Sequence, residues 1–471
     1  MSKSADRSED RRQPIQGTRR VLPAAHIFGL WAFGVAQPIF DLIGKEPDFL
    51  VAHRLSGVPL LALALGLSLA MPALLAAPLA HPATTNGRIG RWYLNGLRAL
   101  LAAAFLLQLL DLELLANAPA APVAALALAG GVGLVLALHR WHGFAQLVGI
   151  TAAAALVAPT LFLVRPGVRT LLPGDLPGED FRPPPEIAQA AAFASDLPIV
   201  LVVFDELPAS SLQRQDGSIN PHRFPAFAEL AIGSDWYRRA VTVGLQTSKA
   251  IPALLTGRQP RPGGTAHYRD HSNNLFTWLA VAGRYRIVAQ ETLSLLCPPA
   301  ICAEETRPGA PTRLAAVIDD LGVVYAHLLL PTAFTDSLPD IRNTWTDFRD
   351  ASRSPQEREG DRPGRGGALN QDVPRLVADF LDRMRPVEDS APGFYYLHLN
   401  IPHRPWKYLP SGREYRPVGA RALPHGFDGR RLPEDEWLTV HGLQRHLLQV
   451  GYADRVLGQL MDRLRSLGMY D

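Results

Sequence analysis

The chain has 471 residues, too many for one ordinary domain, and it is 47% hydrophobic with a formal net charge of +3. Residues 21–164 hold only 11 of its 91 Asp, Glu, Lys and Arg side chains, whereas residues 165–471 hold 71. This asymmetry excludes a uniformly soluble protein and a disordered one. The small net charge, without basic runs interleaved with aromatics, argues against a nucleic-acid partner. The composition predicts a membrane protein with a soluble half.

Five apolar stretches are long enough to cross a bilayer as helices, which takes about 20 residues each. They are residues 21–44, 58–80, 94–116, 121–138 and 144–164. The first is too long for a cleavable signal peptide, and four more follow it. The third contains Asp111 and Glu113. Asp111 follows Leu94 by 17 residues, about 25 Å along a helix, so we interpret it as an interfacial residue without a catalytic role.

The cationic residues predict the orientation, because Lys and Arg in short loops resist translocation. Residues 1–20 form a basic tail, and the loops at 81–93 and 139–143 also carry Arg. The only Lys or Arg residues in the intervening loops are Lys45 and Arg54. We therefore expect a cytoplasmic N-terminus in the inner (cytoplasmic) membrane. Five spans would then leave the rest of the chain on the periplasmic or extracellular side.

The second half reads as a linker at 165–195 followed by an exported domain at 196–471. Continuous apolar or aromatic runs predict strands, and longer amphipathic patterns predict helices. The expected strands are 198–204, 285–289 and 393–399, and the expected helices are 224–232, 275–283, 312–330, 372–385 and 437–467. Alternating strands and helices predict an α/β domain with a mostly parallel sheet and helices on both faces. Residues 349–371, rich in Arg, Gly, Ser and Pro, are typical of a surface excursion.

Cys297 and Cys302 are the only cysteines, within the segment LCPPAIC. An oxidising exterior favours a local disulfide that staples this loop. The prolines between them could instead hold the thiols apart. Two thiols alone would make an incomplete metal site.

Two acidic residues, Asp205 and Glu206, directly follow the apolar run VLVVF. Ligands gather at the carboxyl ends of parallel strands, where a carboxylate is well placed to bind a divalent cation. From spacing alone, it is equally reasonable that Asp205 caps the following turn.

Thr247 opens the segment TSKAIPALLTGR at an expected helix start. A hydroxyl at this position commonly caps the helix. The same position also suits a nucleophile, since a helix N-terminus favours the negative charge of a phosphate or sulfate. The motif alone does not separate these readings.

Two histidines belong to the segment YLHLNIPHRPW at the end of the last expected strand. A histidine can donate a proton to a leaving group or an oxyanion. We expect His398, within the strand, to be structural. His403, just past the strand and between prolines, has the better functional claim.

Taken together, the segments VLVVFDE, FPAFAELA, TSKAIPALLTGR and YLHLNIPHRPW resemble the sulfatase-like branch of the alkaline phosphatase superfamily. The closing segment GYADRVLGQLMDRLRSLGMYD is similar to the helix before that family's last metal-binding strand. The resemblance covers about residues 195–471. Five spans followed by an exported domain resemble the layout of lipoteichoic acid synthases and phosphoethanolamine transferases.

The resemblance implies an alkaline-phosphatase-like fold and a role for individual residues. Asp205 matches the first metal-binding carboxylate, and Glu206 matches a neighbouring acidic position. Thr247 matches the nucleophile, which also ligates the metal. His403 matches a histidine that contacts the transferred group, and Lys249 would assist there. The implied cofactor is a divalent metal: zinc, manganese, magnesium or calcium.

Two departures from the family pattern carry consequences. Formylglycine sulfatases need Cys or Ser at the nucleophile position, where this chain has Thr247, so sulfate-ester hydrolysis by the usual route is not expected. The family also supplies an Asp-His metal pair on a later strand, and the sequence stops at Asp471, where that strand should begin. We therefore expect an apparently truncated domain, either a fragment of a longer enzyme or a form that is not catalytically competent.

The leading hypothesis is a membrane enzyme that hydrolyses or transfers phosphate esters of an envelope lipid or glycan. Its partners would be the lipid bilayer and that substrate. The first alternative is a sulfuric ester hydrolase. The second is a catalytically incompetent superfamily member that binds an envelope polymer or is vestigial.

Overall fold

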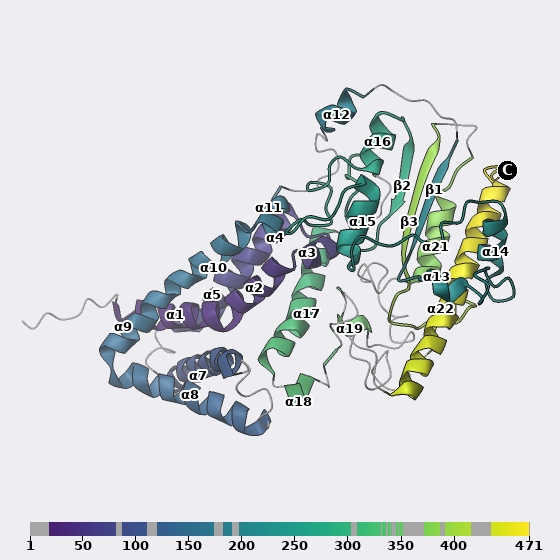
Figure 1. The fold of residues 1–471 in the computed structure, drawn as a ribbon. Helices are drawn as coiled ribbons and strands as arrows, with labels where there is room; N and C mark the ends of the chain where they lie inside the picture. The colour runs from purple at the N-terminus through teal and green to yellow at the C-terminus, as the bar shows by residue number, and fades with distance from the viewer. Residues whose placement is uncertain are drawn as a thin grey trace, which may run out of the picture. The chain divides into compact units, whose positions relative to one another are not determined.

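The computed structural model describes most of the chain (Figure 1). The described residues are 18–81, 87–110, 120–173, 182–190, 197–302, 309–330, 332–335, 338–339, 341, 345–346, 348–351, 372–386, 391–415 and 435–470. Most of the expected basic tail, Asp111, Glu113 and nearly all of the expected excursion at 349–371 lie outside them. The chain divides into two compact units. The first comprises Met1–Leu42, Ala62–Val164 and Tyr325–Ser337, and the second comprises Ile43–Leu61, Arg165–Val324 and Leu338–Asp471.

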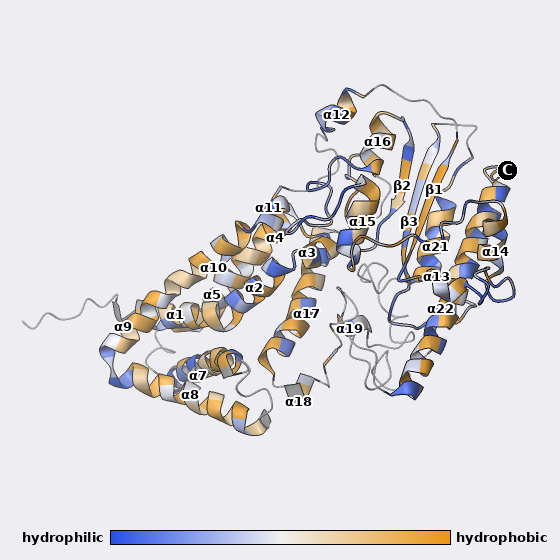
Figure 2. Ribbon diagram, in the orientation of Figure 1, coloured by the Kyte–Doolittle hydropathy of each residue, from blue (hydrophilic) through white to orange (hydrophobic). Residues whose placement is uncertain are grey.

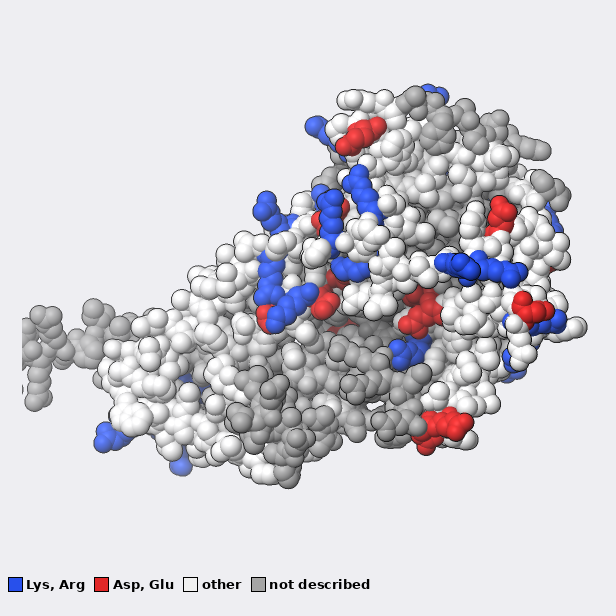
Figure 3. All heavy atoms as spheres, in the orientation of Figure 1, with Lys and Arg blue, Asp and Glu red and all other residues white. Residues whose placement is uncertain are grey.

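Five helices among the described residues are long and apolar enough to cross a membrane. They are Leu22–Lys45, Gly57–Ala80, Arg88–Leu109, Ala121–Arg140 and His142–Leu163, and Figure 2 colours them mostly orange. On the face drawn in Figure 3, the surface over the last of these helices is almost free of charged side chains. These lengths and compositions indicate a multi-pass membrane protein, as the sequence predicts.

The third apolar helix differs from its expected boundaries. It begins at Arg88 rather than at residue 94, so Arg88 and Arg91 occupy its first turns and not a loop. Long arginine side chains near a helix end can extend their charged heads to the interface, and the helix therefore need not begin after them.

The apolar helices are built from shorter elements. They are α1 (Thr18–Trp31), η1 (Ala32–Ala36) and α2 (Gln37–Lys45); α4 (Gly57–Leu65), η2 (Gly66–Ala70), α5 (Met71–Ala76) and η3 (Ala77–Ala80); α7 (Arg88–Leu110); α8 (Ala120–Arg140); and α9 (His142–Ile150), η4 (Thr151–Ala153) and α10 (Ala154–Leu163). Helices α7 and α8 approach closely at Gly131, where an added Cβ would collide with the Ala99 carbonyl oxygen. Small residues permit such close packing between membrane helices.

A π-helical turn, η1, interrupts the first apolar helix just before Pro38. Proline has no N–H, so Pro38 cannot donate to the carbonyl of Gly34, four residues before it. Two side chains of the same unit donate to this carbonyl instead: Gln108 Nε2 at 2.7 Å and Tyr325 Oη at 2.6 Å. The irregular turn and the side-chain donors therefore have one physical cause.

The second unit is built around three parallel strands in the order β1-β3-β2. The strands are β1 (Ile199–Asp205), β2 (Arg286–Gln290) and β3 (Gly393–Pro402). Strand β3 is central; Val203 pairs with His398, and the register shifts between Phe204 and Asp205. The three expected strands are confirmed to within three residues at each end.

Helices cover both faces of this sheet (Figure 1). Tyr395, Leu397 and Leu399 of β3 pack against α21 (Val373–Asp382) and α22 (Glu436–Ser466). On the other face, Phe394 and Tyr396 pack against α15 (Thr247–Thr256) and α16 (Leu275–Val281). A strand buried on both faces needs continuous apolar sequence, and the run at 393–399 in β3 satisfies this need, whereas β1 is only partly buried along its length.

The remaining helices among the described residues are short, apart from α17. They are α3 (Asp48–Ala52), α11 (Pro166–Thr170), α12 (Pro185–Ala188), α13 (Ala209–Leu212), α14 (Pro225–Ile232), α17 (Ala310–Leu329), α18 (Thr332–Thr335) and α19 (Phe348–Ala351). Helix α14 packs on α22 through Ala226, Leu457 and Met461. The five helices expected in this half are therefore present, at slightly different boundaries.

Two segments next to the apolar helices pack into the second unit. Residues 43–61, which include the end of the first apolar helix and the start of the second, belong to this unit. The expected linker at 165–195 begins with a packed segment, because Val168 and Leu171 are fully buried and Gly57 N–H donates to the Leu171 carbonyl at 2.8 Å. The apolar side chains of Val168 and Leu171 therefore pack this first part of the expected linker against the second unit.

Candidate functional site

The candidate site lies at the carboxyl end of β1, where Asp205 ends the strand. Thr247 Oγ1 donates a hydrogen bond to Asp205 Oδ2 at 3.0 Å, although 42 residues separate them. Thr247 is the first residue of α15, and Gln246 occupies the N-cap position without a side-chain capping bond. The hydroxyl of Thr247 is thus directed at the carboxylate and does not cap its own helix.

Glu206 and His403 form a second contact at the same end of the sheet. His403 Nε2 lies 3.5 Å from Glu206 Oε1. Glu206 has a φ of 58°, in the left-handed region that few non-glycine residues adopt. Such backbone conformations cost free energy and are often found at functional sites.

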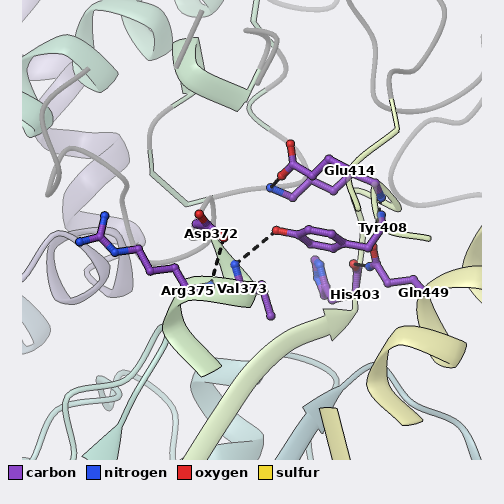
Figure 4. Close-up of polar contacts among 8 residues, drawn as sticks. Asp372, Val373, Arg375, His403, Tyr408, Glu414 and Gln449 are labelled. Carbon is purple, nitrogen blue, oxygen red and sulfur yellow. Dashed lines mark hydrogen bonds and ion pairs between the residues drawn. The ribbon is translucent and has the colours of Figure 1, made fainter. Parts of the chain in front are cut away.

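His403 is held in place through its backbone (Figure 4). Gln449 Nε2, on α22, donates to the His403 carbonyl at 2.8 Å. The Oε1 atom of the same side chain accepts from the N–H groups of Lys407 and Tyr408 at 3.0 and 3.3 Å. Tyr408 Oη in turn accepts from the N–H of Val373, the first residue of α21. Buried hydrogen bonds from two helices therefore fix the loop that carries His403.

Lys249 points to a different environment. Its Nζ donates to the Gly264 carbonyl at 2.6 Å and lies 3.5 Å from Asp48 Oδ2. Asp48 is buried and also accepts from the Ala266 N–H at 2.9 Å. The charge of Lys249 is thus paired with a residue of the segment between the first two apolar helices. Its predicted assistance to the nucleophile stays a prediction.

Strand β3 carries three polar side chains at alternating positions: Tyr396, His398 and Asn400. Alternate residues of a strand share one face, which here is the face that packs against α15. Tyr396 and His398 are fully buried. The Tyr396 hydroxyl, both ring nitrogens of His398 and Asn400 Oδ1 have no hydrogen-bond partner among the described residues. Buried polar groups are nearly always paired, so this row of atoms calls for a partner of its own.

Burial governs the ionisation of this row. It lowers the pKa of His398 to about 4, an effect that the charge of Asp205 offsets in part and that His403 adds to. Burial, with the negative charges of Glu291 and Asp205, raises the pKa of the Tyr396 hydroxyl well above its ordinary value. Both side chains are therefore neutral at pH 7. Their unpaired atoms are neutral hydrogen-bonding groups beneath the Thr247–Asp205 pair.

Sequence reasoning missed a second histidine near Glu206. His446, on α22, lies 3.1 Å from Ser211 Oγ, and its ring packs edge-on against Trp406. Burial lowers the pKa of His446, and the charge of Glu206 opposes that shift. No local signal marks His446, because it lies in a long helix 240 residues after Glu206, and only the fold brings the two together.

The cysteines lie beneath the sheet on the α16 side. Cys297 and Cys302 form a disulfide with a Cα–Cα distance of 6.0 Å, and both are buried. The chain at the first cysteine is anchored by Glu291, whose carboxylate accepts from the N–H groups of Leu296 and Cys297. The bridge lies in a structural loop and takes no part in the contacts of the candidate site.

The donor set limits which metal would fit. Thr247 Oγ1 and Asp205 Oδ2 lie 3.0 Å apart, and no group of three His, Cys, Asp or Glu side chains in the described residues could hold an ion. A zinc site usually needs three protein ligands, so these residues alone do not complete one. Magnesium keeps several waters and binds through one or two carboxylates, so Asp205 with Thr247 suits a hard, hydrated cation better.

The chain was compared with known proteins at the level of family, sequence and fold. It matches no protein-family model, no curated protein and no solved structure.

Proposed function

We propose that the protein is a membrane-anchored, metal-dependent enzyme that hydrolyses or transfers phosphate esters of an envelope lipid or glycan. The proposal includes an alkaline-phosphatase-like fold for the second unit, as the motif resemblance implies. The observation that carries it is the hydrogen bond from Thr247, at the N-terminus of α15, to Asp205 at the end of β1.

Thr247 would act as the nucleophile. The N-terminus of α15 favours the negative charge of a bound phosphate. As Thr247 Oγ1 forms its bond to phosphorus, Asp205 Oδ2 is the carboxylate oxygen in contact with the departing proton. The phosphothreonine would then be attacked by water or by an acceptor alcohol. A bound hard cation would supply charge neutralisation for the phosphoryl oxygens.

His403 would act as the general acid that protonates the leaving group. Its ring contacts Glu206 at 3.5 Å, and the Gln449 bond fixes its backbone. A histidine so placed can donate a proton to the departing alkoxide, a contribution worth roughly 100- to 10,000-fold in rate.

The test compares purified full-length protein and variants on phosphate and sulfate monoesters, with and without added Mg²⁺, Mn²⁺, Zn²⁺ or Ca²⁺. We expect metal-dependent turnover of the phosphate ester and a loss of roughly a thousandfold or more in kcat for Thr247→Val. Thr247→Ser should retain part of the activity. Thr256→Val is the matched control, because Thr256 closes the same helix and its hydroxyl bonds only backbone groups there: it donates to the Pro252 carbonyl and accepts from the Arg258 N–H.

Each result bears on the hypotheses separately. Preference for the sulfate ester would favour the sulfuric ester hydrolase. Turnover unchanged in Thr247→Val would remove Thr247 from the mechanism. No turnover of either ester with any of the four metals would favour the binding role.

A further inference from the structure

One apolar segment occurs within residues 165–471, the part of the chain that carries most of the charged side chains. Residues 321–335, LGVVYAHLLLPTAFT, contain no Asp, Glu, Lys or Arg, whereas Asp319, Asp320 and Asp336 flank them. Fifteen residues are too few to cross a bilayer, which takes about 20. Stretches of this length occur in buried helices and in segments that enter a membrane without crossing it.

The structure assigns the later part of this segment to the unit of apolar helices. Tyr325–Ser337 clusters with Met1–Leu42 and Ala62–Val164, although about 160 residues of the other unit's sequence precede it. Helix α18, at Thr332–Thr335, contacts α8 of that unit. The apolar character of the segment therefore coincides with its place among the apolar helices.

The contact of Tyr325 places this segment at membrane depth. Tyr325 Oη donates to the Gly34 carbonyl at 2.6 Å, and Gly34 lies near the middle of the helix Leu22–Lys45. Twelve residues separate Gly34 from Leu22, which is about 18 Å of helix. A side chain bonded there lies far from both ends of the span.

The hydrogen bond from Tyr325 also satisfies a backbone carbonyl of the first span. Pro38 leaves the Gly34 carbonyl without its ordinary helical donor, and an unsatisfied carbonyl in hydrocarbon costs several kcal/mol. Tyr325 and Gln108 are the two side chains that donate to it. A residue that lies between β2 and β3 in the sequence thus completes the hydrogen bonding of a membrane helix.

We infer that Tyr325–Thr335 is a re-entrant segment, in which the end of α17 and α18 is inserted in the bilayer and Phe334 faces hydrocarbon. Phe334 is 48% exposed in the structure. An exposed aromatic side chain on an element that packs among membrane helices is suited to lipid contact. This inference does not depend on the reaction proposed above.

Site-directed spin labelling of the full chain in lipid nanodiscs tests the inference. The protein's own cysteines are disulfide-bonded, so one introduced cysteine carries the reactive thiol. Labels at Phe334→Cys and Ile318→Cys compare the end of the segment with an exposed position earlier on α17. Leu161→Cys on α10 is the lipid-facing reference and Leu245→Cys is the water-facing one; both side chains are at least 60% exposed.

The readout is collision of the nitroxide with oxygen, which partitions into hydrocarbon, and with a nickel chelate, which stays in water. We expect the Phe334 label to match Leu161, with high oxygen and low nickel accessibility, and the Ile318 label to match Leu245. Nickel accessibility at Phe334 equal to that at Leu245 would overturn the inference. Low accessibility to both reagents would also overturn it, since protein and not lipid would then cover Phe334.

Discussion

At the scale of single residues, His398 combines full burial with two unpaired ring nitrogens. The sequence suggested a structural role for it. A structural histidine in a core is normally hydrogen-bonded, because an unsatisfied buried polar group costs about 1–3 kcal/mol. His398 lies on β3, on the face that packs against α15, the helix that begins with Thr247.

The burial of His398 predicts a pH dependence of stability. Its pKa falls from an ordinary 6.5 to about 4 in the folded state, so below pH 6.5 the unfolded chain takes up the proton more readily. Stability is then complete above pH 6.5 and lost progressively down to pH 4, by about 3 kcal/mol in total. Thermal unfolding midpoints of the solubilised protein between pH 4 and 7 measure this loss.

His398→Leu isolates that contribution, because leucine does not titrate. We expect its unfolding midpoint to fall less steeply with decreasing pH than that of the unchanged protein. His222→Leu, which replaces an exposed histidine, is the control and should leave the slope unchanged. Identical slopes for His398→Leu and the unchanged protein would contradict the assigned protonation.

At the scale of elements, the short helix α3 and the two residues after it make contacts that the sequence did not predict. They lie in a segment that the sequence offered only as a loop between spans. His53 Nε2 lies 2.9 Å from Asp320 Oδ2, and both side chains are buried. Arg54 donates to the carbonyls of Ser294 and Glu291. Asp48 also pairs with Lys249. Together, these contacts make α3 an integral part of the second unit.

We predict that Asp48→Ala destabilises the protein by about 1–3 kcal/mol, because it leaves the Ala266 N–H and the Lys249 ammonium without their buried acceptor. Glu46→Ala, two residues earlier at an exposed position, should change stability by less than about 0.5 kcal/mol. Thermal unfolding of the full chain at pH 7 measures both. Equal shifts for the two variants would mean that Asp48 does not anchor α3.

Strands and long helices were predictable because each follows from a local pattern. The run IVLVVF predicts a strand, and the amphipathic stretch of α22 predicts a helix. The π-helical turn at Ala32–Ala36 was not predicted, although Pro38 was the signal for it. The docking of α3 depends on contacts across more than 200 residues, and no local pattern contains them.

At the scale of the whole molecule, the site was predictable only in part. Asp205, Thr247 and His403 follow from strand ends and one helix start, and the structure brings Asp205 and Thr247 into contact. The partners of these residues were not predictable: Gln449 and His446 lie on α22 and reach the site through helix packing. Lys249 was predicted to assist the nucleophile, but its contacts are with Gly264 and Asp48.

The packing of α3 also constrains the membrane topology. The loop at 46–56, between the first two apolar helices, and residues 165–324 belong to one unit, so we expect them on the same side of the membrane. An even number of spans must therefore separate them, and the four helices from Gly57 to Leu163 satisfy this condition. From the charge distribution, which favours a cytoplasmic tail, we predict that this common side is outside.

This topology predicts that Trp141 and Leu245 lie on opposite sides of the membrane, because the helix His142–Leu163 is the one span between them. Both side chains are exposed, so cysteines introduced there accept a thiol reagent. In intact cells with a permeable outer layer, an impermeant maleimide should modify Leu245→Cys at once and Trp141→Cys only after lysis. Modification of both before lysis would show that the helix between them does not cross. The reverse pattern would keep the five spans but invert the orientation, and the domain would then face the cytoplasm, away from any envelope substrate.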